Sequence, residues 1–240
     1  MTKGETRTNI KVIDEVNHTN TDINENGPFL SREDMDRVKS KLYEIVNAES
    51  VVVLSGSVPK NVDKNIYMDF IEKVREKGAK VILDADGELL KNGIKAGPYM
   101  IKPNINELEE FFNEKIENNE DAVRLSRELF KYGVEIIVIS MGDKGALFIK
   151  KDMAAYAHGL EADVKSTVGA GDAMVAALAV SLDNNFSFEK SIGLALACGT
   201  ANVTTSGTQA ADICTILDFE KQVEFEYLDC KGATQFTFHI

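Results

Sequence analysis

Short apolar runs alternate with amphipathic stretches between residues 51 and 140. The apolar runs are rich in Val and Ile, as buried strands are, and the intervening stretches place apolar side chains at helical spacing. We predict strands at 51–54, 80–84, 99–104 and 135–140. We predict helices at 63–77 and 120–132. This alternation indicates an α/β protein with a mostly parallel sheet that helices cover on both faces.

The two ends of the chain follow other patterns. Polar and apolar residues alternate in "TNIKVID" (8–14) and more weakly in "NTDIN" (20–24), before the turn-forming "NENGP" (24–28). This predicts one or two half-exposed strands outside the main sheet, with an irregular arm as the alternative. Residues 219–240 are rich in aromatic residues and predict either a last strand pair or a poorly ordered end. The expected division is therefore 1–30, 31–218 and 219–240.

Charge and composition narrow the function classes. The 240 residues carry a net charge of −12, which argues against a general nucleic-acid binder and requires a local basic cluster for any anionic substrate. Because no apolar run approaches the roughly 20 residues of a membrane span, and the first residues lack a signal-peptide core, the cytoplasm is the expected location. C-x-x-C, H-E-x-x-H and G-x-S-x-G motifs are absent.

The segment "STVGAGDAMVAALAV" (166–180) carries the strongest chemical signal. Glycines let successive backbone N–H groups turn toward one point, and the apolar stretch after them predicts a buried helix whose positive end adds to an anion site. Asp172 at this helix start is either a cap or a base toward a hydroxyl that attacks a bound phosphoryl group. A Walker A motif is absent, and Met174 stands where a dinucleotide fingerprint requires Gly or Ala.

Several motifs together resemble one family. "TVGAGDAMVAAL" is similar to the signature of the ribokinase-like carbohydrate kinases, the PfkB family. Four other segments resemble the same family in the same order, namely "LSGSVPKNV" (54–62), "IKPNINELEEFF" (101–112), "ISMGDKGALF" (139–148) and "ANVTTSGT" (201–208). Within the family, "GETRTNIKVID" and "TDINENGP" look most like the bacterial 1-phosphofructokinases, with tagatose-6-phosphate kinases next.

The resemblance implies a ribokinase-like fold with a small β lid and a kinase reaction. The implied reaction is the ATP-dependent phosphorylation of fructose 1-phosphate to fructose 1,6-bisphosphate, with tagatose 6-phosphate as the alternative acceptor. Asp172 would be the base. The anion hole would be formed by the backbone N–H groups of Gly169, Ala170 and Gly171. Asn104 and Glu107 match the family's N-x-x-E and would organise Mg²⁺, although a turn residue and a first-turn helix charge are the ordinary interpretations of such residues.

The resemblance also assigns the substrate and nucleotide contacts. Arg7, Asn9 and Lys11 fall on one face of the predicted N-terminal strand by its period of two, and become candidates for the substrate phosphate. Ser57 and Lys102 are further substrate candidates, although each basic residue alone is more often a solvated surface charge. The implied nucleotide contacts are Ser140, Gly142, Gly145, Thr167, Asn202 and Gly207. Gly145 can also simply serve the turn before "ALFI".

One departure from the family changes the expectation for activity. The family normally begins with a longer N-terminal portion that carries a first strand, an early Asp and a G-G-x-G-x-N segment for the sugar, and this sequence shows neither the early Asp nor that segment. The nucleotide half and the base look complete, whereas the acceptor half does not. A chain that binds nucleotide without catalysis is therefore the alternative to the kinase. Lids in this family often meet in a dimer, so a homodimer through the lid is expected.

Overall fold

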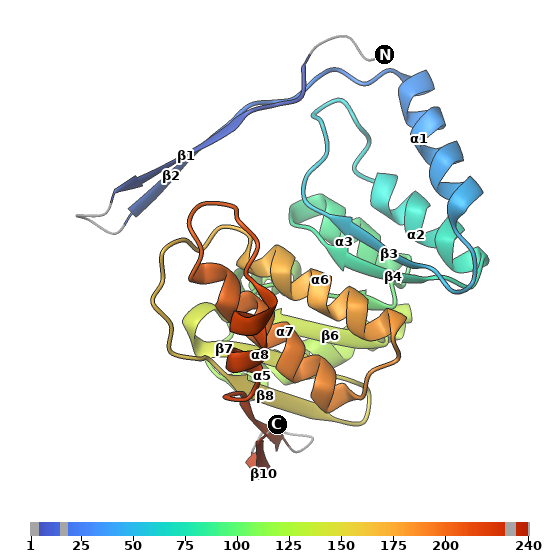
Figure 1. Cartoon of the computed structure of the whole chain (residues 1–240). Helices are drawn as coiled ribbons and strands as arrows, with labels where there is room; N and C mark the ends of the chain where they lie inside the picture. The colour runs from blue at the N-terminus through green and yellow to red at the C-terminus, as the bar shows by residue number, and fades with distance from the viewer. Residues whose placement is uncertain (1–4, 15–18, 229–233, 240) are drawn as a thin grey trace.

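The four apolar runs of the central segment form neighbouring parallel strands. In the computed structural model, which describes residues 5–14, 19–228 and 234–239, they lie side by side in one half of an eight-stranded sheet (Figure 1). These strands are β3 (Val51–Ser55), β4 (Lys80–Asp84), β5 (Met100–Ile101) and β6 (Ile136–Ser140). The crossovers between them are α2 (Ile66–Glu76), α3 (Gly87–Lys95), α4 (Ile105–Phe112), α5 (Asn119–Arg127) and the 3-10 helix η1 (Glu128–Tyr132). The predicted α/β class and its parallel strands are confirmed.

Two of the predicted strands differ from the expectation. The strand predicted at 99–104 is only two residues long, and Pro103, which has no N–H to donate, lies just beyond it. The run at 51–54 was expected to be fully buried. Instead β3 lies at the edge of the sheet, where it pairs only with β4 among the described residues, and Val53 is 39% exposed.

The other half of the sheet is antiparallel, so the sheet as a whole is mixed. After β6 the chain adds β7 (Gly145–Ile149), β8 (Ala154–His158), β9 (Glu224–Leu228) and β10 (Thr234–His239), each antiparallel to its neighbour. Of the two alternatives for the C-terminal segment, the structure contains the strand pair, and β9 joins the main sheet beside β8. The residues before it are helical through α8 (Ile213–Glu220).

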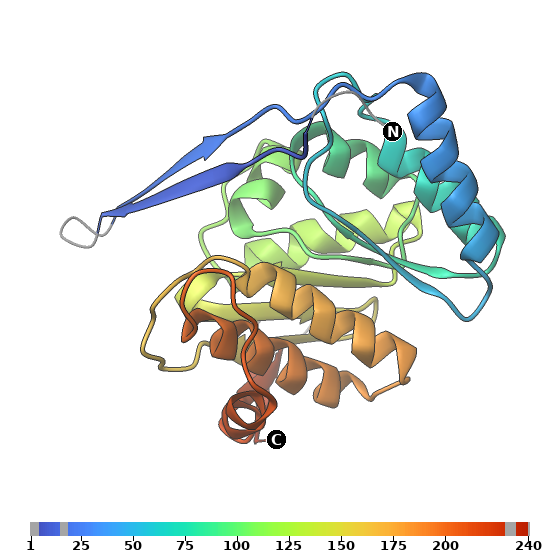
Figure 2. The same ribbon diagram turned by 45° about the horizontal axis from the view of Figure 1, so that its top comes forward.

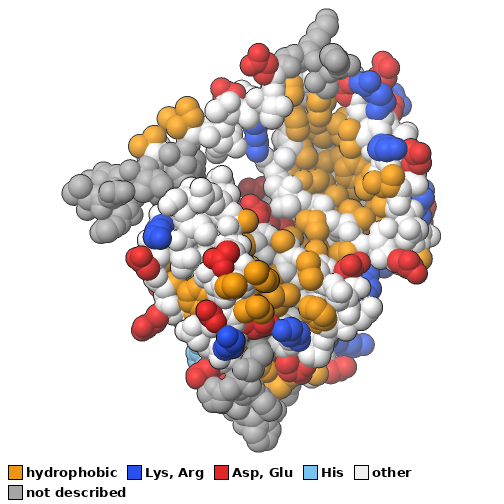
Figure 3. Space-filling model, in the orientation of Figure 1, with side chains coloured by type: hydrophobic (Ala, Val, Ile, Leu, Met, Phe, Trp, Pro, Cys, Tyr) orange, Lys and Arg blue, Asp and Glu red, His pale blue; other side chains and the backbone are white. Residues whose placement is uncertain are grey.

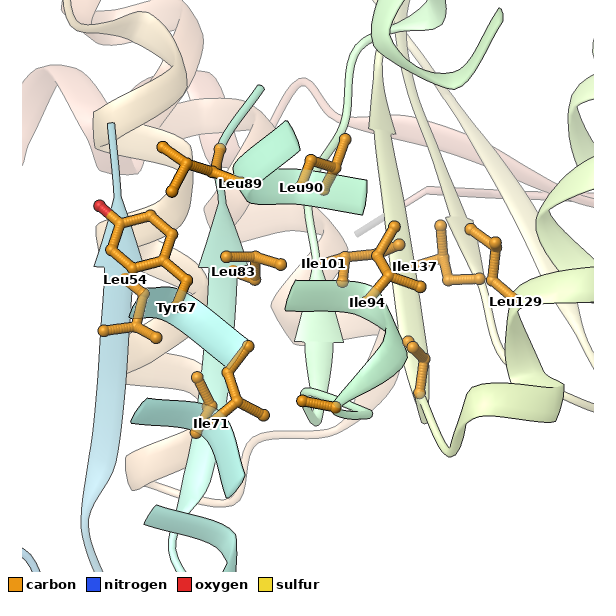
Figure 4. Packing of buried hydrophobic residues seen from close by; sticks show 14 of the residues in the cluster. Leu54, Tyr67, Ile71, Leu83, Leu89, Leu90, Ile94, Ile101, Leu129 and Ile137 are labelled. Atoms are coloured by element: carbon orange, nitrogen blue, oxygen red, sulfur yellow. The ribbon is translucent and has the colours of Figure 1, made fainter. Parts of the chain in front are cut away.

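Alternate strand residues build two separate cores, one on each face of the sheet. Ile137 and Ile139 of β6 face α2, α3, α4 and α5, whereas Ile136 and Val138 face the other side. Figure 4 shows the first core, in which Leu54, Leu83, Ile101 and Ile137 continue from one strand to the next. The second core is closed by α6 (Ala170–Asp183) and α7 (Phe188–Val203). The prediction of helices on both faces is confirmed.

A two-stranded hairpin projects from this body. It consists of β1 (Asn9–Asp14) and β2 (Thr19–Asn24), and both ribbon views show it extending away from the sheet (Figures 1 and 2). The prediction of half-exposed strands outside the main sheet is therefore confirmed. Ile10, Val12 and Ile23 on one face of the hairpin are 54%, 51% and 54% exposed.

The hairpin leads into α1 (Arg32–Ile45), which packs against α2. Val38 and Ile45 of α1 are exposed, and the space-filling view shows hydrophobic side chains gathered between α1 and β3 (Figure 3). None of the helices in the described part of the chain is both long and apolar enough to cross a membrane.

Candidate active site at the start of helix α6

The segment singled out by the sequence forms the start of α6. Gly169 precedes the helix with a φ of 81°, a left-handed conformation that glycine adopts without a Cβ clash. No side chain in the described part of the chain caps this end of the helix, so the first N–H groups of α6 have no intrahelical or capping partner there. Met174, Val175 and Leu178 anchor the helix in the core. The start of α6 thus has the properties of a rigid anion-binding site.

Asp172 is the third residue of α6 and is exposed. Its carboxylate makes no hydrogen bond or ion pair with any other described residue, and it does not act as the cap that was the ordinary interpretation of this residue. An acid that is fixed on a rigid helix beside free N–H groups, and that has open access, can accept a proton from a group bound there.

Asn202 holds the glycine loop before α6 in place. Its side chain is 7% exposed, and its Nδ2 donates to the carbonyl oxygen of Val168 at 2.9 Å. A Cβ added to Gly169 would lie 3.3 Å from the same nitrogen, so a larger residue at that position would press on the amide. The family resemblance assigned Asn202 to the adenine. In this structure its side-chain amide holds the loop, which is a positioning role.

Lys102 lies against the same helix end. Its Nζ is 3.0 Å from Oδ1 of Asp84, and the two side chains are only 7% and 17% exposed. A Cβ on Gly171 would come within 3.4 Å of this Nζ, so the ammonium group lies directly beside the start of α6. The hydroxyl of Ser55 donates to Oδ2 of Asp84 at 3.2 Å. Lys102 was expected to contact substrate, and here its charge is paired within the protein.

Asn104 and Glu107 form a capping box at the start of α4. Oδ1 of Asn104 accepts from the backbone N–H of Glu107 at 2.9 Å, and Oε2 of Glu107 accepts from the backbone N–H of Asn104 at 2.9 Å. Burial raises the pKa of Glu107, and the nearby carboxylates Asp84 and Asp86 raise it further against the opposing effect of Lys102. The ordinary interpretation of both residues, as helix-start residues, is therefore observed.

These residues also fit a magnesium ion that arrives with a nucleotide. Among the described residues, no three acidic, Cys or His side chains are grouped to hold a metal alone. Mg²⁺ is usually held by one or two carboxylates together with phosphates and waters, so a dedicated cage is not required. Each carboxylate oxygen of Glu107 accepts one bond from Asn104, Oε2 from the backbone N–H and Oε1 from Nδ2 at 2.8 Å, and each keeps a further lone pair. The repulsion that the carboxylate receives from Asp84 and Asp86 would be relieved by a cation.

The glycine turn after β6 contains two glycines with different roles. Ser140 ends β6, and the 3-10 helix η2 (Gly142–Lys144) follows it. A Cβ on Gly145 would lie 2.0 Å from the carbonyl oxygen of Ala157, so glycine is required there by the close approach of β8. Gly142 has a φ of 63° and open space where a Cβ would stand, so this backbone is accessible to a ligand. Of the two interpretations of Gly145, the structure supports the turn.

The remaining predicted residues lie at the surface. Thr167 and Ser57 are exposed, and Gly207 has open space where a side chain would stand. On the hairpin, β1 begins at Asn9, so Asn9 and Lys11 share a face by the strand period, whereas Arg7 precedes the strand and falls outside that argument. Lys11 lies opposite Asp22 in the register of the hairpin.

Sequence reasoning missed Asp84 and Asp86. They end β4 and begin α3, next to the end of β5 that bears Lys102. Polar residues at the carboxyl ends of adjacent parallel strands meet at one edge of a sheet, and the pattern "LDADGE" (83–88) after a predicted strand carries that signal. Tyr67 was also missed. Its hydroxyl donates to the carbonyl oxygen of Ser55 at 2.9 Å and so fixes the turn after β3.

The fold thus brings an uncapped helix start, an open carboxylate and a buried Lys–Asp pair together at the carboxyl ends of the strands. Phosphoryl-transfer enzymes use preorganised N–H donors and a positioned carboxylate of this kind. A family model described as pfkB family carbohydrate kinase matches residues 1–214. The chain therefore belongs to the pfkB family of carbohydrate kinases.

Individual relatives agree with the family assignment. The chain is 34% identical over 222 residues to the 1-phosphofructokinase of Borreliella burgdorferi, covering 92% of this chain and 69% of that protein. It is 31% identical over 199 residues to the 1-phosphofructokinase of Bacillus subtilis, covering 83% and 64%. Phosphofructokinase-2 from Escherichia coli, in a crystal structure with potassium, matches with a TM-score of 0.83 at 26% identity, covering 90% and 70%. The chain thus spans about two thirds of the length of these relatives.

Proposed function

We propose that the chain transfers the γ-phosphoryl group of ATP to fructose 1-phosphate and forms fructose 1,6-bisphosphate. The single observation that carries the proposal is the uncapped start of α6 with the open carboxylate of Asp172 on its first turn. The choice of acceptor rests on the relatives, which bear the name 1-phosphofructokinase at 31–34% identity. The proposed location is the cytoplasm, where ATP and sugar phosphates are available.

The proposed step uses three features of the helix start. The acceptor hydroxyl attacks the γ-phosphorus, its proton passes to the carboxylate of Asp172, and the bond to the ADP oxygen breaks. The N–H groups of Gly169, Ala170 and Gly171 stabilise the negative charge that develops on the transferred group. Because α6 is anchored in the core, these donors need no rearrangement as the charge develops.

Asn104 and Glu107 would hold the magnesium ion of Mg-ATP, in part through water. When bound, Mg²⁺ neutralises the charge on the phosphate oxygens. The ion pair of Lys102 and Asp84 would have a positioning role, because it lies beside Gly171 and holds this end of α6 in place. The open backbone at Gly142 and Gly207 and the exposed Thr167 are the proposed nucleotide contacts.

The hairpin is proposed to act as a lid and as a dimer contact. Its polar residues Asn9 and Lys11, with Arg7 before them, would meet the substrate phosphate, and lid closure would exclude water. Its opposite face exposes Ile10, Val12 and Ile23. A two-stranded hairpin is marginal in water by itself, so packing this face against a second copy would stabilise it. Light scattering of the wild-type chain and of Ile10→Ser should give a dimer and a monomer, respectively.

The kinase proposal is tested by ADP release from Mg-ATP with fructose 1-phosphate, run beside tagatose 6-phosphate. Asp172→Asn should lower kcat by at least about 10²-fold, because the base is lost, and should leave ATP binding intact. Asp121→Asn is the matched control, since Asp121 is likewise the third residue of its helix, α5, and should change kcat by less than about twofold.

Each outcome of this test is informative. Turnover on fructose 1-phosphate that disappears in Asp172→Asn supports the proposal. Faster turnover on tagatose 6-phosphate would change the acceptor but keep the role of Asp172. ATP binding without turnover on either sugar would contradict the kinase and favour a nucleotide-binding chain. Equal rates for Asp172→Asn and the wild type would remove Asp172 as the base.

A further inference from the structure

A cavity lies at the opposite end of the strands from the candidate active site. Its volume is about 170 Å³. It opens beneath the amino ends of β4 and β6, next to the second half of α6 and the turn into α7. The apolar part of its wall is formed by Met100, Ile136, Phe148, Leu178, Leu182 and Phe186. This volume is about that of five or six water molecules, which suits a single small ring or a short branched chain.

Two half-buried lysines stand at this cavity. Nζ of Lys80 lies 5.3 Å from the centroid of the Tyr99 ring, and Nζ of Lys150 lies 4.5 Å from the centroid of the Phe188 ring. All four residues line the cavity. Neither ammonium group forms an ion pair with an acidic group in the part of the chain that the structure describes. In a chain of net charge −12, two lysines at one cavity without a carboxylate in contact leave both ammonium groups open to an anion.

Two carboxylates lie near these lysines without forming an ion pair with them. Glu189 is the acid near Lys150, and its Oε1 is already engaged by a 2.5 Å hydrogen bond from the hydroxyl of Tyr227. Glu135 is the acid near Tyr99. The two serine hydroxyl groups in the wall are also already used in hydrogen bonds. The hydroxyl of Ser181 donates to the carbonyl oxygen of Ala177 at 2.8 Å, and that of Ser191 donates to the carbonyl oxygen of Ser187 at 2.8 Å.

Both serine protons are therefore committed to α6 and α7, and Lys80 and Lys150 remain as the charged donors for a ligand. We propose that this cavity binds a small organic anion that joins an apolar body to a carboxylate or phosphate group. The body would fill the space between Ile136, Phe148 and Leu178, and the anionic group would lie at the two ammonium groups. Ammonium groups held over aromatic rings keep their charge available on the side away from the ring. Inorganic phosphate would lack the body, and a neutral ring would lack the charge.

The test is a binding titration of the full chain, by calorimetry or by NMR line shifts, in the absence of ATP and sugar. The probes are benzoate, phenyl phosphate, benzyl alcohol and inorganic phosphate. Benzoate or phenyl phosphate should bind saturably, and the one that binds more tightly identifies the anionic group. Lys80→Gln and Lys150→Gln should each weaken this binding at least about tenfold, and Lys150→Arg should retain it, because the positive charge is what the anion recognises.

Lys131→Gln is the matched control, because Lys131 also stands over an aromatic ring, that of Tyr132, at 5.2 Å and away from the cavity. Its binding should equal that of the wild type, and thermal unfolding of every variant checks that it is folded. The proposal is overturned if neither anion binds at millimolar concentration, if benzyl alcohol binds as tightly as the anions, or if the two glutamine variants bind like the control. Since no kinase substrate is present, the result does not depend on the proposed phosphoryl transfer.

Discussion

Lys102 and Asp84 form a buried ion pair across two neighbouring strands, with 3.0 Å between Nζ and Oδ1, and Nζ of the lysine also lies beside Gly171. The pair joins the ends of β4 and β5 to the start of α6. Three elements that are distant in sequence therefore meet at this ion pair. Removal of one partner leaves the other charged and desolvated, which is costly in a protein interior.

We therefore expect Lys102→Met to lower the free energy of unfolding by about 3–5 kcal/mol. Chemical denaturation measures this change. Lys73→Met is the control, since Lys73 forms an ion pair of similar length, 2.7 Å to Glu76, but both side chains are more than half exposed. Its denaturation midpoint should hardly move. Equal shifts for the two variants would contradict the buried role of Lys102.

Replacement of Glu107 by Gln should raise stability and lower the affinity for Mg-ATP. Burial and the nearby Asp84 and Asp86 raise its pKa, so the folded chain takes up this proton more readily than the unfolded chain. The contribution of Glu107 to stability is therefore fully present below its unfolded pKa and is lost as the pH rises through the folded pKa. Glu107→Gln removes the charge and keeps one acceptor oxygen for the N–H groups of Asn104, as the protonated carboxyl does, so its melting temperature at pH 7 should exceed that of the wild type.

The advantage of Glu107→Gln should disappear on acidification, when the wild-type carboxyl is protonated. Melting curves between about pH 4 and pH 8 measure the gap between the two proteins. At the same time, the apparent affinity for Mg-ATP should fall, because Gln is a weaker ligand for Mg²⁺ than a carboxylate. A difference in melting temperature that is the same at every pH would contradict the argument that the buried charge of Glu107 destabilises the fold.

Two glycines with positive φ should respond differently to alanine. At Gly145 the new Cβ would lie 2.0 Å from the carbonyl oxygen of Ala157, and φ is 104°. At Gly142 φ is 63° and the new Cβ meets open space. Gly145→Ala should cost about 3 kcal/mol or more, and Gly142→Ala about 1–2 kcal/mol from backbone strain alone. Denaturant titration of both variants compares the costs, and a smaller loss for Gly145→Ala would contradict the close approach of β7 and β8.

Asn202 offers a comparison between a buried and an exposed amide. Its Nδ2 donates to Val168 at 2.9 Å under the glycine loop, and Nδ2 of the exposed Asn184 donates to Val180 at the same 2.9 Å. Asn202→Ala leaves the half-buried carbonyl of Val168 without its donor and should cost about 1–3 kcal/mol, whereas Asn184→Ala should change stability by less than about 0.5 kcal/mol. The first variant should also raise KM for ATP, because the loop before α6 is no longer held.

Sequence patterns predicted the elements whose environment is local. The strand at Lys80–Asp84 was predicted to the residue, because a strand buried on both faces is a continuous apolar run. The start of α6 was also predicted, because its glycines and the apolar run that follows them lie within one segment. The edge position of β3 was not predicted. Its run is as apolar as that of β4, and nothing within five residues shows how many neighbours a strand has.

The site residues divide along the same line. Asp172 could be named as a candidate from the sequence, because the features that single it out lie within its own helix. Asp84 was missed, because its partner Lys102 lies 18 positions further along the chain and meets it only through the pairing of β4 with β5. The bond from Asn202 to the glycine loop was not predicted, for the same reason. A buried amide is assigned by the carbonyl that it meets, and that carbonyl comes from another loop.

The division of the core between the two faces of the sheet affects the order in which the two faces can be covered during synthesis. β4, β5 and β6 are complete by residue 140, but the helices that cover their Ile82, Met100 and Ile136 side chains, α6 and α7, begin at residue 170 and end at residue 203. At ribosomal rates of about 5–20 residues per second, that apolar face waits for several seconds. We therefore expect this face to be exposed during synthesis, and to stay open to chaperones that bind exposed apolar strands until α7 has left the ribosome.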